Sequence, residues 1–309
     1  ESVFIHSLFA LDDSLYFVLS GDTEKAIESL RDTIRVARRA NNLLVMIIAT
    51  CELAEMQALQ GQLGQAWATL VRAQYMTAGP DGEPLPLAGL VDVGMGEILL
   101  ERNELDEAGV YLERGCRITQ SLWSVSSLDG MVSLAHLRQA QGDIAGSQAM
   151  IEEAARIALS TESSQWDDAI VSAIAVRLAL QRSDLAAAAQ WWERGGFPDI
   201  TRAITLEDYP YPVFEYLQLT RARFLMAKGL DAGSAPELRQ AFEVLETLLI
   251  EVERLQRTTS QIEILVLQAM VRSALGDDDE ASAMLLHALA LGEPEGYQRI
   301  YLDEGRHLL

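Results

Sequence analysis

Apolar positions recur along this chain with the spacing of amphipathic helices, in segments separated by single turn-forming residues. A Gly, Asn or Ser closes one apolar segment and opens the next at Gly21, Gly61, Asn103, Gly142, Ser183, Gly229 and Gly276. The spacing is about 40 residues, with the last two intervals slightly longer, which is typical of arrays of helical hairpins. The pattern predicts about seven antiparallel hairpins, with a helix on each side of every turn residue.

Small residues recur at fixed distances from these turns. Five residues after the turn stand Ala26, Ala66, Ala108, Ser147, Ala188 and Ala281. Seven residues before it stand Ser14, Ala54, Gly96, Ala135, Val176, Ala222 and Ala269. Nine residues after it stand the bulky residues Leu30, Leu70, Leu112, Ile151, Trp192 and Leu285, on the same helical face as the small residue four positions earlier. Both helices of each pair therefore carry a stripe suited to close packing.

The sixth repeat departs from this register. After Gly229, the segment Asp231–Pro236 separates the turn residue from a predicted helix over about Glu237 to Leu255. We interpret Asp231–Pro236 as an insertion that lengthens the loop.

The fold class predicted is all-α: a right-handed superhelix, or solenoid, of tetratricopeptide-like hairpins that forms one domain over residues 1–309. A solenoid grows by adding layers, so this length does not strain a single core. The chain is 49% apolar with 8 Pro, and no uninterrupted apolar run approaches the ~20 residues of a membrane-spanning helix. We expect no membrane contact, a cytoplasmic location, and reduced, buried thiols at Cys51 and Cys116. The chain begins with Glu and shows no secretory leader pattern, which suggests a piece of a larger protein.

The net charge of −22 bears on partners. Such a surface repels phosphate backbones, and no cluster of Lys and Arg interrupts it, so we expect no direct binding of nucleic acid by this segment. Solubility alone is the simpler explanation of the acidic excess.

Signatures of catalysis are missing. His6, His136, His287 and His307 fit no zinc-ligand spacing, and there is no GxxxxGK[ST] phosphate loop. The sequence predicts no enzyme activity, no metal and no cofactor. An enzyme hidden in a groove would need an acid–base pair, and Glu97 with His136 is the pair to test.

An ionisable column suggests a binding surface. Six residues before the turn, five consecutive repeats carry Glu55, Glu97, His136, Arg177 and Arg223. Stacked hairpins would align them along a groove that changes from acidic to basic, suited to a polar ligand or a peptide. The alternative is a row of exposed polar residues satisfied by water or by each other.

Aromatic residues precede the sixth repeat in the stretch Tyr209–Tyr216. Rings near a groove stack on sugars or other ring-containing ligands, and Tyr hydroxyls orient them. Core or hinge packing is the favoured explanation for most of these rings, and Tyr209 and Tyr211 are the candidates for ligand contact.

Three segments, Glu215–Gly229, Ile262–Ala269 and Ala288–Gly305, carry a family resemblance. They resemble the sensor region of MalT-like, ATP-dependent LuxR-family transcriptional regulators. The most specific is the last, ALALGEPEGYQRIYLDEG, in which Gly292 stands for the usual Ala and Tyr301 for the usual Phe of that family's AEPEGY-R-F-DEG run. The sharp resemblance covers about residues 211–309, and the earlier repeats match in pattern only.

The resemblance implies a sensor role. In such regulators an ATPase and a winged-helix arm precede the superhelix, and a helix-turn-helix follows it. This chain would then bind a small-molecule inducer or a regulatory protein or peptide, and bias self-association and DNA binding by the full-length protein. The rival hypothesis is a stand-alone tetratricopeptide scaffold for protein–protein interaction, and the flanking sequence would separate the two.

Overall fold

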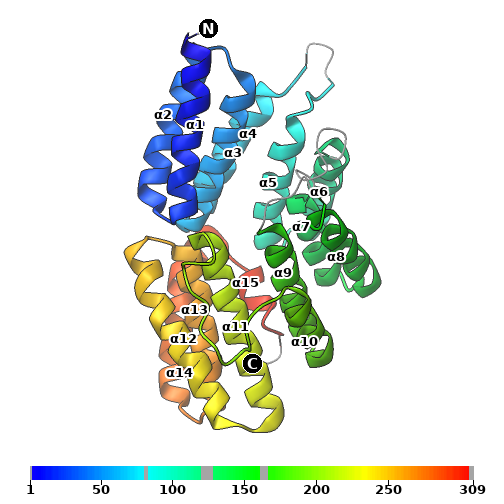
Figure 1. Ribbon diagram of the computed structural model, residues 1–309, viewed down its shortest axis with the longest axis vertical. Coiled ribbons are helices and arrows are strands. Elements are labelled where there is room, and N and C mark those ends of the chain that lie inside the picture. The colour runs from blue at the N-terminus through cyan, green and yellow to red at the C-terminus, as the bar shows by residue number, and fades with distance from the viewer. Residues whose placement is uncertain (1, 80–82, 120–127, 161–165, 306–309) are drawn as a thin grey trace. The chain divides into compact units, whose positions relative to one another are not determined.

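The computed structural model describes residues 2–79, 83–119, 128–160 and 166–305 (Figure 1). Over these residues the chain consists of α-helices joined by turns and by the longer connection 195–210, with one isolated bridge between Ala78 and Pro84 and no β-sheet. The predicted all-α class is confirmed.

The described helices pair in chain order into seven hairpins, as predicted. They are α1 (Ser2–Ser20) with α2 (Thr23–Arg39), α3 (Leu43–Leu59) with α4 (Leu63–Met76), α5 (Ala88–Glu101) with α6 (Leu105–Thr119), α7 (Leu128–Ala140) with α8 (Ile144–Ala158), α9 (Asp167–Gln181) with α10 (Leu185–Arg194), α11 (Tyr211–Ala232) with α12 (Ala235–Arg254), and α13 (Thr258–Ala274) with α14 (Asp278–Gly292). A 3₁₀ turn, η2 (Glu293–Glu295), and the one-turn helix α15 (Arg299–Leu302) follow.

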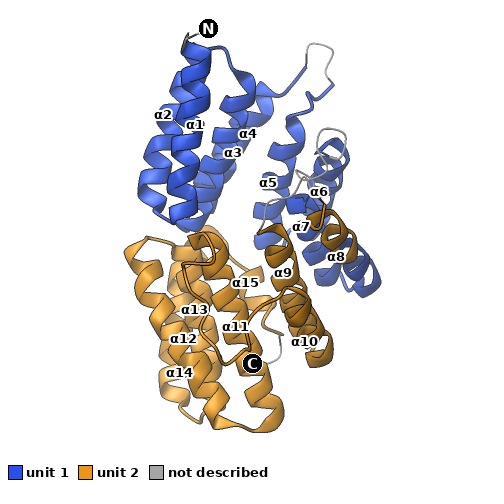
Figure 2. Ribbon diagram, viewed as in Figure 1, with its two compact units in different colours: residues 1–150 blue, residues 151–309 orange. Residues whose placement is uncertain are grey.

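The chain forms two compact units, residues 1–150 and 151–309, with the boundary inside α8 (Figure 2). In the first unit the first helices of successive hairpins, α1, α3, α5 and α7, pack side by side, and in the second unit α9, α11 and α13 do the same. Within each unit the first helices therefore form one layer, as in a helical-repeat array. One continuous superhelix over 1–309 stays a prediction.

The turn residues behave as their chemistry requires. Six of the seven have a positive φ, namely Gly21, Gly61, Asn103, Gly142, Ser183 and Gly276. Left-handed backbone at a helix end is easiest for Gly, and Asn tolerates it better than most residues. Side chains such as Asp22 and Asp184 then cap the following helix by accepting hydrogen bonds from backbone N–H groups.

The sixth hairpin corrects the predicted turn. Gly229 lies inside α11, and the left-handed residue that ends this helix is Gly233, with φ 61°. The added residues are helical, because Asp231 belongs to α11 and Pro236 to the first turn of α12. The expected loop insertion was wrong: both helices are extended by about one turn, which pairs Gly229 closely with Leu238.

The small stripes lie in the core together with five of the six bulky residues, whereas Leu285 is only partly buried. All seven small residues of the first helices are buried, and so are all six small residues of the second helices. A Cβ at Gly96 would lie 2.5 Å from Cγ of Leu112, so α5 and α6 approach closely only because residue 96 is Gly. The predicted close-contact stripes are confirmed.

Among the residues that the structure describes, one helix is long and apolar enough to cross a membrane by length and composition. The segment Val3–Ser20 of α1 has a mean hydropathy of 1.4 and only 17% of it is buried. It nevertheless pairs with α2, where the Ser14 hydroxyl lies 2.8 Å from that of Thr33 and Leu11 packs into the core. We interpret α1 as the first helix of a hairpin.

Candidate functional site

The five residues of the predicted column lie on five successive first helices. Glu55 is on α3, Glu97 on α5, His136 on α7, Arg177 on α9 and Arg223 on α11. The first three belong to the first unit and the last two to the second, so the two parts are described separately.

In the first unit, Glu97 lies in an acidic environment. Its Oε1 accepts a hydrogen bond of 2.7 Å from the hydroxyl of Ser133 on α7. The pKa of Glu97 is raised to about 8: desolvation by the surrounding protein is the main cause, the hydrogen bond from Ser133 opposes it, and the charges of Asp129 and Glu55 add to it. Glu97 is exposed as a residue, whereas its hydrogen bond with Ser133 is partly buried and desolvation is the main cause of the raised pKa.

Two further carboxylates belong to this environment and escaped the sequence analysis. Burial, and then the charges of Glu55 and Asp129, raise the pKa of Glu52. Glu52 precedes Glu55 by one helical turn, and Asp129 precedes His136 by two, so both lie on the faces that carry the column. The helical spacing was therefore the signal that could have found them.

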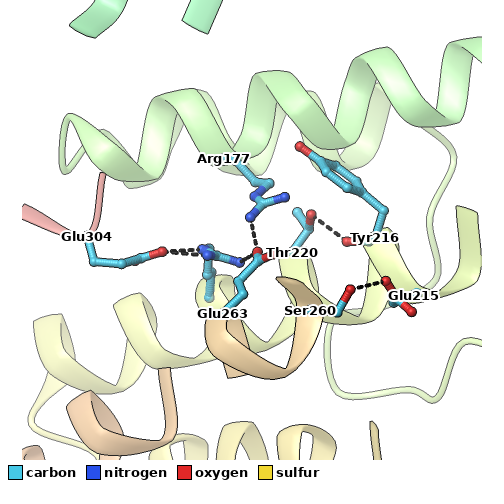
Figure 3. A network of polar contacts seen from close by, with 8 residues as sticks. Arg177, Glu215, Tyr216, Thr220, Ser260, Glu263 and Glu304 are labelled. Atoms are coloured by element: carbon cyan, nitrogen blue, oxygen red, sulfur yellow. Dashed lines mark hydrogen bonds and ion pairs between the residues drawn. The ribbon is translucent and has the colours of Figure 1, made fainter. Parts of the chain in front are cut away.

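In the second unit, the two arginines of the column converge on one carboxylate. Arg177 and Arg223 both donate hydrogen bonds to Oε1 of Glu263 on α13, the bond from Nη1 of Arg223 being 2.6 Å long. The three side chains are 13%, 8% and 13% exposed. Figure 3 shows Arg177 reaching from α9 towards Glu263.

Tyr216 completes the surroundings of Arg177. The guanidinium carbon lies 4.5 Å from the centre of the Tyr216 ring, a cation–π distance. Burial alone would lower the pKa of Arg177, but Glu263 and Tyr216 outweigh it and raise the pKa above its usual value. Burial would likewise raise the pKa of Glu263, and the two arginines lower it instead. Arg177 and Glu263 therefore each favour the charged form of the other.

A second carboxylate reaches Arg223 from residues 293–305, which follow the seventh hairpin and are called the terminal segment below. Glu304 accepts a 2.9 Å hydrogen bond from Nε of Arg223 and another from Nη2. Its side chain is 9% exposed. Arg223 therefore divides its donors between Glu263 on α13 and Glu304 on the terminal segment.

Aromatic hydroxyls position that terminal segment. The hydroxyl of Tyr297 lies 2.7 Å from that of Thr259, and the hydroxyl of Tyr301 donates a 2.8 Å hydrogen bond to the carbonyl of Ala288. Gly296, with φ 83°, turns the chain between η2 and α15. Tyr297 and Tyr301, both in the segment Ala288–Gly305, thus hold the terminal segment against α13 and α14.

A cavity of about 710 Å³ adjoins the arginines. Its apolar wall comes mainly from Leu180, Met226, Leu230 and Met270. Arg177 and Arg223 line it, and so does Glu304. This volume falls within the range of small-molecule sites, roughly 300–1,000 Å³.

The predicted tyrosines lie apart from this cluster. Tyr211 starts α11, about three helical turns from Arg223, and is 6% exposed. Its ring lies 5.5 Å from the guanidinium of Arg257, which forms a buried ion pair of 2.6 Å with Glu215. Burial and the Glu215 charge raise the pKa of Tyr211.

Tyr209 lines a different cavity, of about 820 Å³, together with Trp166, Arg202 and Asp208. Tyr209 is half-buried, and burial followed by the Asp208 charge raises its pKa. Tyr209 therefore belongs to a separate hollow of the second unit.

Glu263 and Glu304 were not among the site residues predicted from the sequence. Glu263 precedes Met270, the column position of α13, by two helical turns, and Tyr216 precedes Arg223 by the same distance. That spacing could have revealed Glu263. Glu304 gave no such signal, because it lies beyond the last hairpin. Over the described part of the chain, no three His, Cys, Asp or Glu side chains are grouped to hold a metal ion.

The fold and the layered first helices define a tetratricopeptide-like helical-repeat protein. Similar chains among solved structures include a Rap protein complexed with competence and sporulation factor, with TM-score 0.66 and 12% identity over 94% of this chain and 75% of that one. A tetratricopeptide repeat protein from Parabacteroides merdae gives TM-score 0.46 and 15% identity over 98% and 99% of the two chains. BtubC from P. vanneervenii gives 0.44 and 14% over 89% and 93%.

The family follows from the sequence. The model of the MalT-like TPR region matches residues 6–309. The chain therefore belongs to the MalT-like TPR family. A search of curated proteins found no match.

Proposed function

We propose that this chain is the inducer- or partner-binding sensor domain of a signal-responsive bacterial transcriptional regulator. Membership of the MalT-like TPR family over residues 6–309 carries this proposal. The sensor would control ATP-dependent multimerisation and DNA binding by other domains of the full-length protein, in the cytoplasm. With a net charge of −22, this segment itself would not bind DNA.

The layer of first helices supports a binding role. It carries an acidic environment around Glu97 and, separately, the Arg177–Arg223 cluster with its adjoining cavity. The Rap protein of similar fold is complexed with competence and sporulation factor, which is consistent with recognition by helical-repeat arrays. The bound species would be a small-molecule inducer or a regulatory protein or peptide.

Such a sensor responds to its ligand only if its two conformations bind that ligand with different affinities. A ligand that binds both arrangements equally shifts nothing, so the site must change with the switch. We infer that the sensor performs no catalysis, so that Glu97 and His136, the two residues considered as an acid–base pair, would contact a ligand without converting it. Substituting either by Ala would then leave chemistry undetectable, and turnover lost in both variants would refute this.

The alternative is a stand-alone tetratricopeptide scaffold for protein–protein interaction, which the hairpin fold favours equally. Sequencing the complete reading frame separates the two proposals. An ATPase with a phosphate loop upstream and a helix-turn-helix downstream would support the regulator. A stop codon soon after Leu309, without an ATPase before Glu1, would refute the regulator and favour the scaffold.

A further inference from the structure

Arg223 presents a carboxylate-binding pair of donors to the terminal segment. Nη1 of Arg223 donates a hydrogen bond to Glu263, whereas Nε and Nη2 both donate to Glu304. The fork of a guanidinium matches a carboxylate, and the side chain of Arg223 is only 8% exposed. If Glu304 left, two N–H donors would face the cavity without their acceptor, which is unfavourable at a buried site.

The segment that carries Glu304 is held mainly by polar contacts. Beyond Tyr301, Leu302 is 51% exposed, Asp303 pairs with Arg299 on the same segment, and Gly305 is exposed. No buried apolar side chain anchors residues 302–305 to the rest of the second unit. Segments with few buried apolar contacts open locally at low free energy, so release of Glu304 need not disturb the hairpins.

The cavity beside this pair has a clear chemical preference. Leu180, Met226, Leu230 and Met270 give it an apolar wall, and its charged lining consists of Arg177, Arg182 and Arg223 with Asp231, Asp303 and Glu304, so that release of Glu304 leaves an excess of positive charge. Met226 and Met270 are 6% and 7% exposed, and thioether side chains adapt to ligands of varied shape. An apolar body with one carboxylate matches both features.

We propose that this cavity binds a small organic acid, whose carboxylate replaces that of Glu304 on Arg223 while its apolar body lies against Met226 and Met270. The proposal rests on the proposed function, of which it specifies the inducer class. Binding releases residues 302–305, which lie beyond the seventh hairpin. The carboxylate of Glu304 is thus an internal competitor for the site.

Competition makes a quantitative prediction. When a ligand binds only the open state, its apparent Kd equals the intrinsic Kd divided by the fraction of molecules in that state. If Glu304 occupies Arg223 nine times in ten, removing its charge tightens binding of the acid about tenfold. A simple apolar pocket would show no such gain.

Octanoate is the probe, and 1-octanol is its neutral counterpart of equal length. Titration calorimetry gives the Kd for the 309-residue chain and for Glu304→Gln and Glu304→Ala. Methyl NMR of the methionines reports the place of binding. We expect octanoate to shift Met226 and Met270 but not Met95 and Met131 of the first unit, and to bind the Glu304 variants about tenfold or more tightly than the parent.

Glu293→Gln is the matched control, because it removes one negative charge from an exposed site on the same terminal segment. Its octanoate affinity should stay within about twofold of the parent, and 1-octanol should gain nothing from any variant. Adding Arg223→Gln to Glu304→Gln should abolish the gain. Circular dichroism and the Met131 signal verify folding.

Equal octanoate affinities of the parent and both Glu304 variants, a gain that survives Arg223→Gln, or shifts away from Met226 and Met270 would overturn the proposal. The outcome is separable from that of the proposed function. A reading frame without the ATPase removes the regulatory role but leaves the octanoate result intact. A failed octanoate test removes this ligand class but leaves the family membership and the reading frame unaffected.

Discussion

The hydroxyl group of Tyr301 occupies the space that a side chain at Gly292 would need. A Cβ built at residue 292 overlaps that hydroxyl, which itself donates to the carbonyl of Ala288. These are the two positions at which the chain departs from the AEPEGY-R-F-DEG run. The departures are complementary, because Gly leaves room for the oxygen that Tyr adds.

Gly292→Ala should therefore destabilise the chain by about 1–3 kcal/mol, as overpacking does. Tyr301→Phe should cost about 0.5–1.5 kcal/mol through its lost hydrogen bond. The double variant should lose no more than Tyr301→Phe alone, because Phe makes room for the new methyl group. Urea denaturation of the four proteins measures this coupling, and additive losses would contradict it.

Glu263→Gln should be among the most damaging single charge removals in the second unit. It leaves Arg177 and Arg223, 13% and 8% exposed, facing each other without their shared carboxylate. Breaking a buried ion pair in this way typically costs about 3–5 kcal/mol. The measurement is the free energy of unfolding in urea.

Glu251→Gln is the control for this substitution, since its pair with Arg254 is exposed, at 43% and 64%. Exposed pairs contribute at most about 1 kcal/mol. Similar losses from the two variants would show that Glu263 does not hold the arginines together.

Gly96→Ala tests the close approach of α5 and α6. The new Cβ would meet Leu112 at 2.5 Å, and a loss of about 1–3 kcal/mol is expected. Gly109→Ala on α6 is the control, because its nearest neighbour, Cδ2 of Leu137, lies at an ordinary 3.5 Å. There, the gain in helix propensity should stabilise the chain by about 0.5–1 kcal/mol. A neutral Gly96→Ala would mean that the helices are not in tight contact.

Glu97 should make stability fall as pH rises. Its pKa in the folded chain is raised to about 8 from 4.5, so between these values the folded state binds more protons than the unfolded state. The stabilising contribution is complete below pH 4.5 and is lost as the pH rises through 8. Glu97→Gln should flatten this dependence and make the chain more stable than the parent at alkaline pH.

Ser133→Ala provides the reverse change. The hydroxyl of Ser133 lowers the pKa of Glu97 through its hydrogen bond, so its removal should raise that pKa further. Carboxyl NMR titration reads the pKa directly in the parent and in Ser133→Ala. A pKa of Glu97 at the ordinary value of Glu, or one that falls in Ser133→Ala, is the contrary result.

Much of the fold was predictable because it is local. Turn residues such as Gly61 and Asn103 adopt positive φ for reasons contained in a few neighbouring residues, and the small stripes follow from helical spacing. The turn of the sixth hairpin was predicted wrongly because Gly229 stands at the spacing of a turn residue. It lies inside α11 instead, where the absence of a side chain leaves room for Leu238 of α12.

The candidate site was predictable only in part. Arg177 and Arg223 share a position in the repeat, which brings them together as expected. Glu304 joins them from 81 residues beyond Arg223, through a fold-back that no periodic pattern describes. A repeat pattern predicts which residues of successive hairpins lie side by side. It does not predict contacts made by a segment outside the repeats, such as that of Glu304 with Arg223.

Amide hydrogen exchange of residues 299–305 most directly tests whether Glu304 holds the terminal segment on Arg223. A charged hydrogen bond contributes about 1.5–3 kcal/mol, so Glu304→Gln should speed exchange there by about tenfold or more. Exchange in α11 and α13, and throughout Glu293→Gln, should stay at the parent rate. Unchanged exchange at 299–305 in Glu304→Gln would contradict the role assigned to this ion pair.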